Sequence, residues 1–322
     1  MLLEASLAIL VGLVILVWSA DRFVDGSASL ARYLGMSQLL IGILIIGFGT
    51  SMPEMVVSAL SAINHSPGIA LGNAYGSNIT NIALILGLTA LIKPLSVHFS
   101  VIKKELPILI FVTLLSVYFL FDLHLDRTEA IMLLVIFLLY ILWTIWSSKK
   151  QRASIQAAYA EESETESMSL KASILWIIGG LLLLIISSQL LVWGATQIAQ
   201  HFGVSDLIIG LTIVAVGTSL PEIAASIVAA RKGDVDLAVG NIIGSNLYNT
   251  LAVVGLAGAI TSIQAEPEIL SRDMSVMTGL TLFLFIIGYA VSKQGKKIGR
   301  LSGAVLMGSY IGYTLYLIQT AI

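Results

Sequence analysis

The chain contains no cysteine and very little charge, and both shortages limit what the protein can be. Without cysteine it forms no disulfide and offers no thiolate to a metal. Only 11% of its 322 residues are charged, whereas 57% are hydrophobic and the mean hydropathy is +0.96. Soluble domains are about 25% charged, so this composition indicates an integral membrane protein. The net charge of −2 includes no long basic tract, and we expect no nucleic-acid partner.

Hydrophobic stretches long enough to cross a bilayer recur along the chain and predict an all-α membrane protein with ten transmembrane helices. The predicted spans are 3–20, 38–63, 69–92, 105–121, 129–147, 172–197, 206–230, 236–260, 273–292 and 300–320. The first span lacks the basic start and the cleavage site of a signal peptide, so we expect it to be retained. The expected partners are the lipid bilayer and inorganic cations, and no partner protein is implied.

A polar run between the fifth and sixth spans divides the chain into two halves of five spans. It covers residues 149–171, where we expect a partly disordered cytoplasmic linker. The predicted units are therefore 1–148, the linker, and 172–322. Because five is an odd number, the second half enters the membrane from the opposite side, and the halves form an inverted repeat.

The distribution of basic residues agrees with this topology. If the N-terminus lies outside, the odd-numbered loops face the cytoplasm and hold fifteen of the seventeen Lys and Arg residues, leaving Arg127 and Arg272 outside. Short cytoplasmic loops are enriched in Lys and Arg, so this split predicts that both termini lie outside. The expected location is the plasma membrane.

One passage occurs twice, 168 residues apart. It consists of GTSMPE or GTSLPE, followed about twenty residues later by GNAYGSNITN or GNIIGSNLYN. Residues 49–81 align with 217–249 without a gap and are identical at 14 of 33 positions. The repeated residues are mostly Gly, Pro, Ser, Asn and Glu, which are unfavourable in a helix exposed to lipid. The passages therefore indicate a functional site within the cores of the two halves, 38–92 and 206–260.

The proline in each copy predicts a break in the second and seventh spans. Pro53 and Pro221 lack an N–H group, so the carbonyls of Gly49 and Gly217 lose their helical partner. A carbonyl freed at membrane depth must face protein or a water-filled cavity. Transporters build cation sites from helices broken in this way.

A glutamate follows each proline directly. In the predicted topology, Glu54 and Glu222 are the only acidic residues well inside spans, and no basic residue lies at comparable depth to pair with them. An intramembrane carboxylate costs about 2.5–3.5 kcal/mol and is a functional candidate by default. If the inverted repeat brings the two together, they repel one another unless a cation or a proton lies between them.

The second phrase of each copy supplies neutral oxygen atoms at every fourth position, which places them on one helix face. These residues are Asn73, Ser77 and Asn81 in the first copy and Asn241, Ser245 and Asn249 in the second. Ser51 and Ser219 lie three residues before the glutamates, on the same side. Oxygen ligands without His or Cys suit hard cations such as Ca²⁺ or Na⁺. For Asn73, Asn78, Asn241 and Asn246, a role in joining neighbouring helices is an equal alternative.

These motifs resemble the two α-repeats of the calcium/cation antiporter superfamily, and the chain most resembles its prokaryotic sodium/calcium exchanger type, including an inner-membrane homologue. The resemblance implies that Glu54 and Glu222 are the central ligands of Ca²⁺ and Na⁺ in a prokaryotic inner membrane. The further ligands that it implies are the carbonyls of Thr50 and Thr218, the hydroxyls of Ser51, Ser77, Ser219 and Ser245, and the amides of Asn81 and Asn249, with the carbonyls of Gly47 and Ala215 as weaker members.

The expected function is antiport of Ca²⁺ against Na⁺ by alternating access, without a cofactor or enzymatic activity. Asn249 stands where some family members have Asp, which makes potassium co-transport less expected and removes a carboxylate. Antiport of Ca²⁺ against H⁺ therefore stays open as an alternative, although the proton-coupled branch has Glu where this chain has Gly76 and Gly244. An intramembrane enzyme is a remote alternative, because G-x-G-D and H-E-x-x-H motifs are both missing from the sequence.

Overall fold

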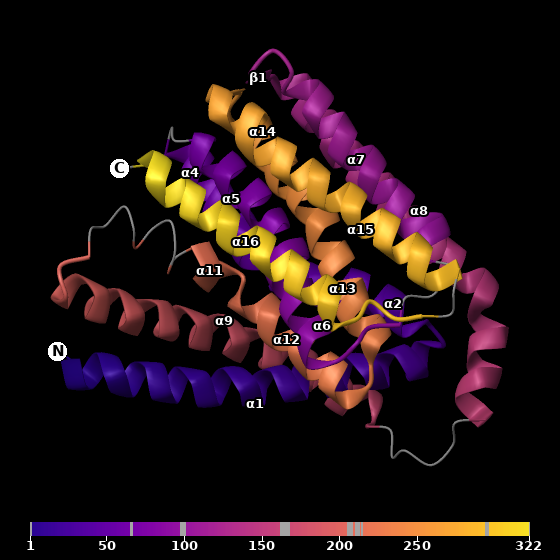
Figure 1. Cartoon of the computed structure of the whole chain (residues 1–322). Helices are drawn as coiled ribbons and strands as arrows, with labels where there is room; N and C mark the ends of the chain where they lie inside the picture. The colour runs from indigo at the N-terminus through magenta and orange to yellow at the C-terminus, as the bar shows by residue number, and fades with distance from the viewer. Residues whose placement is uncertain are drawn as a thin grey trace.

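The structure is a computed structural model, and it is almost entirely helical (Figure 1). It describes residues 2–64, 67–96, 101–161, 168–204, 209, 213, 215–293 and 296–321. The helices of the first half are α1 (Leu2–Leu34), α2 (Gln38–Ile41), α3 (Phe48–Thr50), α4 (Met52–Ile63), α5 (Pro67–Ile79), α6 (Gly87–Ile92), α7 (Leu106–Phe119) and α8 (Arg127–Glu161). Those of the second half are α9 (Leu170–His201), α11 (Ala215–Thr218), α12 (Leu220–Lys232), α13 (Val235–Tyr248), α14 (Val254–Ile260), α15 (Ser275–Lys293) and α16 (Arg300–Ala321).

Wider π-helical turns interrupt or precede several of these helices. They are η1 (Gly42–Gly47), η2 (Thr80–Leu86), η3 (Val101–Glu105), η5 (Asn249–Val253) and η6 (Ile269–Met274). The first residues of η3 and η6 are 168 positions apart, the same offset as the repeated passage. Short π-helical segments often occur at functional sites, where the extra residue per turn redirects side chains.

The prediction of a helical membrane protein is confirmed. Among the described residues, seven helices are long and apolar enough to cross a membrane, and the bent pair formed by α2–α3 and α4 makes an eighth. Of the two remaining predicted spans, the fourth begins with the charged end of η3, and much of the seventh, 206–230, lies outside the described residues. The total of ten spans stays a prediction.

Two helices are longer than predicted. Helix α1 continues beyond residue 20 to Leu34, so that Asp21 and Asp25 are helical. Its 33 residues extend about 50 Å at about 1.5 Å per residue, which exceeds the hydrocarbon core of about 30 Å. Helix α8 continues through the first part of the predicted linker to Glu161, and residues 162–167 lie outside the described part of the chain.

Helices α1 and α9 lie side by side on one flank of the molecule, and α7, α8, α14 and α15 lie on the opposite flank (Figure 1). Glycines allow the backbones of α1 and α9 to approach closely. A Cβ atom added at Gly26 would lie 2.8 Å from the carbonyl oxygen of Ser173, and one at Gly194 would lie 2.7 Å from that of Ala5. Each residue of the first contact is 168 positions from its counterpart in the second.

Loops that the sequence assigns to one side of the membrane contact one another. The Lys232 ammonium group lies 2.7 Å from Oδ1 of Asp21 and also pairs with Asp25, which joins the seventh loop to the extended end of α1. Burial alone lowers the pKa of Lys232, but hydrogen bonds and charge from the two aspartates outweigh it and raise this pKa above its ordinary value. Leu95 of the third loop forms a β-bridge with Ile298 of the ninth.

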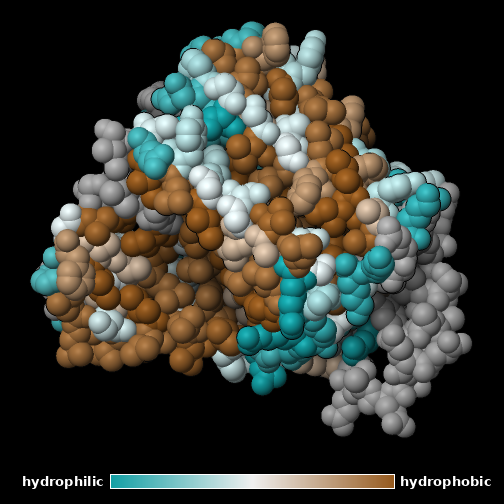
Figure 2. Space-filling view, viewed as in Figure 1, coloured by the Kyte–Doolittle hydropathy of each residue, from teal (hydrophilic) through white to brown (hydrophobic). Residues whose placement is uncertain are grey.

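The loops at the other end form a second set of contacts. Strand β1 (His124–Leu125) pairs in antiparallel fashion with β2 (Ile263–Gln264), a short sheet that the sequence pattern does not predict. Beside it, Nε of Arg127 donates to the carbonyl oxygen of Ala259 at 2.7 Å. On the face shown in Figure 2, hydrophilic residues gather near the ends of the helices and the flank of α1 and α9 is mostly hydrophobic.

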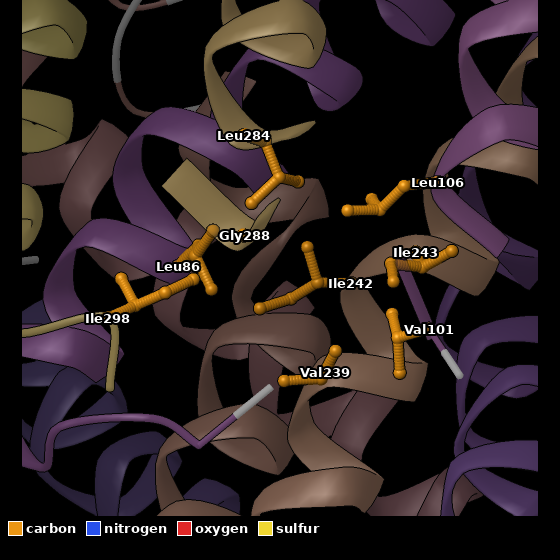
Figure 3. A pocket seen from close by; sticks show the side chains of 9 residues that line it. All are labelled: Leu86, Val101, Leu106, Val239, Ile242, Ile243, Leu284, Gly288 and Ile298. Carbon is orange, nitrogen blue, oxygen red and sulfur yellow. The ribbon is translucent and has the colours of Figure 1, made fainter. Parts of the chain in front are cut away.

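A small cavity of about 10 Å³ remains in the apolar core (Figure 3). It is lined by Leu86, Val101, Leu106, Val239, Ile242, Ile243, Leu284, Gly288 and Ile298. None of these side chains is polar, so the cavity offers a water molecule no side-chain hydrogen-bond partner. We interpret it as a packing defect rather than a binding site.

Gly288→Ala is expected to stabilise the protein. The new Cβ would lie 3.4 Å from Cδ1 of Leu106 and 3.6 Å from Cγ1 of Ile102, which are ordinary contacts. Alanine is favoured over glycine within a helix by about 0.8–1.0 kcal/mol, so the unfolding midpoint in detergent should rise by about 2 °C. Gly303→Ala is the matched control and should lower the midpoint, because its Cβ would lie 2.7 Å from the Gly87 carbonyl oxygen. A lower midpoint for Gly288→Ala would contradict this account of the cavity.

Candidate cation-binding site

Both copies of the repeated passage interrupt their helices at the serine before the proline. Ser51 lies between α3 and α4 with φ −83° and ψ 1°, and Pro53 occupies the first turn of α4. The chain bends by 43° there. Ser219 lies between α11 and α12 with φ −91° and ψ 5°, and Pro221 occupies the first turn of α12. The breaks expected at the two prolines are thus present.

The Gly217 carbonyl, expected to lose its helical partner, faces another helix. It accepts a hydrogen bond of 2.6 Å from the hydroxyl of Ser188 on α9. Position 20, the counterpart of Ser188 at the 168-residue offset, is alanine. The two halves therefore differ in how the pair of α1 and α9 contacts the breaks.

Glu54 and Glu222 lie in the first turns of α4 and α12 and are 1% and 2% exposed. The Ser51 hydroxyl donates to Oε1 of Glu222 at 3.5 Å, which places the first break against the second glutamate. Because Ser51 directly precedes α4, the helix whose first turn carries Glu54, this contact brings the two glutamates to the same region, where two ionised carboxylates would repel one another. Within the described part of the chain, no ion pair compensates either charge.

Several buried side-chain atoms on these elements have no hydrogen-bond partner among the described residues. They are both carboxylate oxygens of Glu54, Oε2 of Glu222, Oγ of Ser219, both amide atoms of Asn81 and Oδ1 of Asn249. A buried polar atom left unpaired costs about 1–3 kcal/mol, and nearly all such atoms in proteins are paired. One or more hard cations would satisfy the oxygens among these atoms together, whereas Nδ2 of Asn81 is a hydrogen-bond donor and needs an acceptor.

The other predicted ligands lie on elements that border this cluster. The Ser245 hydroxyl on α13 donates to the Gly47 carbonyl oxygen at 3.5 Å. Asn81 lies on η2, which packs against α12, and Asn249 begins η5, which packs against α4. Thr50 and Ser51 end the first half of the broken span, and Thr218 and Ser219 end its counterpart, while Ser77 lies on α5, which packs against α11. All ten predicted residues thus lie on elements packed around the two breaks, and their role as ligands stays a prediction.

Carboxylates alone do not form this site. In the ranges that the structure covers, no group of three or more His, Cys, Asp or Glu side chains is placed to hold a metal ion. A cation bound here must therefore take most of its ligands from hydroxyl, amide and carbonyl groups. Such ligands are typical for Ca²⁺ and Na⁺ and unsuitable for zinc or copper.

A second pair of acidic residues is buried inside the protein, at the start of the predicted fourth and ninth spans rather than well inside them. Glu105 and Asp273 are also buried, at 4% and 5% exposure. Tyr140 donates to Oε2 of Glu105 at 3.0 Å, and Tyr313 donates to Oδ1 of Asp273 at 2.8 Å. The two acids are 168 positions apart, so the repeat itself contained the signal for them, although neither lies in the repeated passage.

Comparison with known proteins identifies the family. The model for "Sodium/calcium exchanger protein" matches residues 5–146 and 172–319. This chain belongs to the sodium/calcium exchanger family. The prediction of this family from the paired motifs is therefore confirmed. The two matched segments leave out the predicted linker, 149–171.

Relatives of this exchanger family match nearly the whole chain. The putative antiporter CaxA of Alkalimonas amylolytica is 45% identical over 99% of this chain and 100% of CaxA. The inner membrane protein YrbG of Escherichia coli (strain K12) is 37% identical over 96% of this chain and 95% of YrbG. A structure of the sodium-calcium exchanger NCX_Mj, soaked with zero Na⁺ and Ca²⁺, has a TM-score of 0.85 at 31% identity and covers 98% of this chain and 100% of NCX_Mj. The family confirms the prediction of a transporter rather than an enzyme.

Ca²⁺ is expected to raise the unfolding midpoint of the purified wild-type protein, and Glu54→Gln is expected to abolish most of this rise. A ligand that binds only the folded state stabilises it by about 2.7 kcal/mol at one hundred times its Kd. Glutamine keeps the shape of the side chain but removes one of the two central charges. Thermal unfolding in detergent with Ca²⁺ or with a chelator measures the effect.

Glu105→Gln is the matched control for this experiment. It removes an equally buried carboxylate outside the cluster and should keep the Ca²⁺-dependent rise. Equal rises in the wild type and Glu54→Gln would contradict the placement of the site.

Proposed function

We propose that this protein exchanges Ca²⁺ for Na⁺ across the membrane as a secondary active antiporter. The observation that carries the proposal is the cluster of buried oxygens around Glu54 and Glu222, which lacks hydrogen-bond partners in the described residues. Such a set binds hard cations in place of water. The names of its relatives as sodium-calcium exchanger and antiporter agree with this chemistry.

The charge of the site explains why transport would be an exchange. Two carboxylates carry a charge of −2, which one Ca²⁺ or two Na⁺ would neutralise, and a third Na⁺ would leave one positive charge. Without cations, two like charges would face one another away from water, which is costly. The ion-free site therefore resists crossing the membrane, and each crossing would carry ions in one direction or the other.

We also propose the topology in which the two halves, 1–148 and 172–322, form an inverted repeat of ten spans joined by the linker, with both termini outside. Three observations support it: the family match falls into two segments, the contacts between α1 and α9 recur at the 168-residue offset, and the loops group at two ends. The name of YrbG as an inner membrane protein supports a location in a prokaryotic inner membrane.

Alternating access would come from movement of α1 and α9 past the remaining helices. The two pack mainly against one another, and they meet the broken spans through α2, η1 and α3 in the first half and through α11 and α12 in the second. Their contacts with those spans are both polar and apolar. Lys232 pairs with Asp25 and Ser188 donates to the carbonyl of Gly217, whereas the side chains of Leu181 and Phe23 lie against Gly49.

Flux of ⁴⁵Ca²⁺ into proteoliposomes under separately imposed Na⁺, K⁺ and H⁺ gradients tests the proposed coupling. Only the Na⁺ gradient is expected to drive uptake by the wild type, and Glu54→Gln should abolish it, whereas Glu105→Gln should retain it. Uptake driven by a pH gradient without Na⁺ would show proton coupling instead. Uptake that needs no counter-ion would overturn antiport altogether.

A further inference from the structure

The first asparagine in the second phrase of each repeat, Asn73 or Asn241, donates a hydrogen bond to the backbone carbonyl of a glutamate. Nδ2 of Asn73 lies 3.2 Å from the carbonyl oxygen of Glu54 and 3.0 Å from Oγ of Ser58. An amide group has two N–H donors, so it satisfies both acceptors at once. Because the acceptors are four residues apart, this one side chain fastens the first turn of α4 to α5.

The second half repeats the arrangement residue for residue. Nδ2 of Asn241 lies 3.3 Å from the carbonyl oxygen of Glu222 and 2.9 Å from Oγ of Ser226. All three residues are counterparts of the first set at the 168-residue offset. Both breaks place a glutamate in the first turn of a helix. Because the same two hydrogen bonds occur at both breaks, we infer that these bonds position the glutamate.

Asn241 also connects the two halves. Its Oδ1 accepts a hydrogen bond of 3.1 Å from the hydroxyl of Thr50, which precedes the break in the first half. The position of Glu222 is thus tied through one buried side chain to the end of α3. Helix joining alone requires neither the carbonyl of the glutamate nor a contact with the opposite break.

We propose that Asn73 and Asn241 are positioning residues that fix the separation of the two carboxylates and thereby set which divalent cation fits between them. This inference rests on the proposed function. Selectivity among oxygen-bound cations depends on the size and rigidity of the cavity, and Ca²⁺ binds oxygen at about 2.3–2.6 Å. If hydrogen bonds to the backbone fix the separation of the two carboxylates, the site favours Ca²⁺ over the larger Ba²⁺. If this separation can vary, the site accepts both ions.

The test measures how Ca²⁺ and Ba²⁺ each raise the unfolding midpoint of the purified full chain, as a function of cation concentration. Asn241→Leu keeps the branched shape of the side chain, in a somewhat larger volume, and removes its donors. The Thr50 hydroxyl, which loses Oδ1 of Asn241 as its acceptor, can donate instead to the carbonyl of Ile46, which lies 3.0 Å away. Loss of an outer-shell partner lowers metal affinity about 10–100-fold, so the preference for Ca²⁺ over Ba²⁺ should fall about tenfold.

Asn246→Leu is the matched control on the same helix, since its amide donates to the carbonyl of Ile242 one turn earlier at 2.6 Å. It should keep the wild-type preference. Ser226→Ala removes one of the two bonds of Asn241 and should shift the preference in the same direction by a smaller factor. This milder variant supplies the answer if Asn241→Leu does not fold.

The outcomes separate the inference from the function on which it rests. An unchanged preference in folded Asn241→Leu or in Ser226→Ala, beside a wild type that Ca²⁺ stabilises, would overturn the positioning role alone. A lower midpoint without cations and no change in preference would assign Asn241 to helix joining. A wild type that neither cation stabilises would overturn the proposed function and this inference together.

Discussion

The repulsion between the carboxylates of Glu54 and Glu222 is the constraint around which the other features are arranged. Both groups are buried, and in the described residues neither has a cationic side chain beside it. Each lies in the first turn of a helix, where the positive end of the helix dipole partly offsets a negative charge. The breaks before Pro53 and Pro221 create these two helix starts inside the protein. The unpaired N–H groups at each start and the buried carboxylate beside them therefore stabilise one another.

A second layer of the structure holds that arrangement in place. Asn73 and Asn241 bind the carbonyls of the two glutamates, and π-helical turns begin at or next to Asn81 and Asn249. Each of these features occurs in both halves, so the two halves contribute equivalent residues and equivalent π-helical turns to the site. The second acidic pair, Glu105 and Asp273, extends the correspondence beyond the repeated passage, to the regions where α7 and α15 begin.

The sequence was informative wherever a residue type has one physical consequence. Proline cannot donate a hydrogen bond, so both breaks could be predicted, and the repetition identified the residues that surround them. The sequence was less informative where contacts between distant parts of the chain determine the local structure. The first apolar stretch ends at residue 20, but α1 continues to Leu34, and Asp21 and Asp25 on this extension pair with Lys232. The orientation of Asn73 depends on how closely α5 approaches α4, and the amide composition alone does not determine it.

The hydrogen bond from Ser188 to the Gly217 carbonyl is an asymmetry that would bear on the proposed transport cycle. In the proposed inverted repeat, identical halves would make the inward-open and outward-open forms equal in free energy, since exchanging the halves converts one form into the other. The halves differ at many positions, and alanine at position 20 opposite Ser188 is one difference that would contribute to unequal free energies. A neutral hydrogen bond contributes about 1 kcal/mol, which corresponds to about a fivefold difference in population. If this bond is present in only one of the two forms, one hydroxyl group would by itself shift the balance between them by that factor.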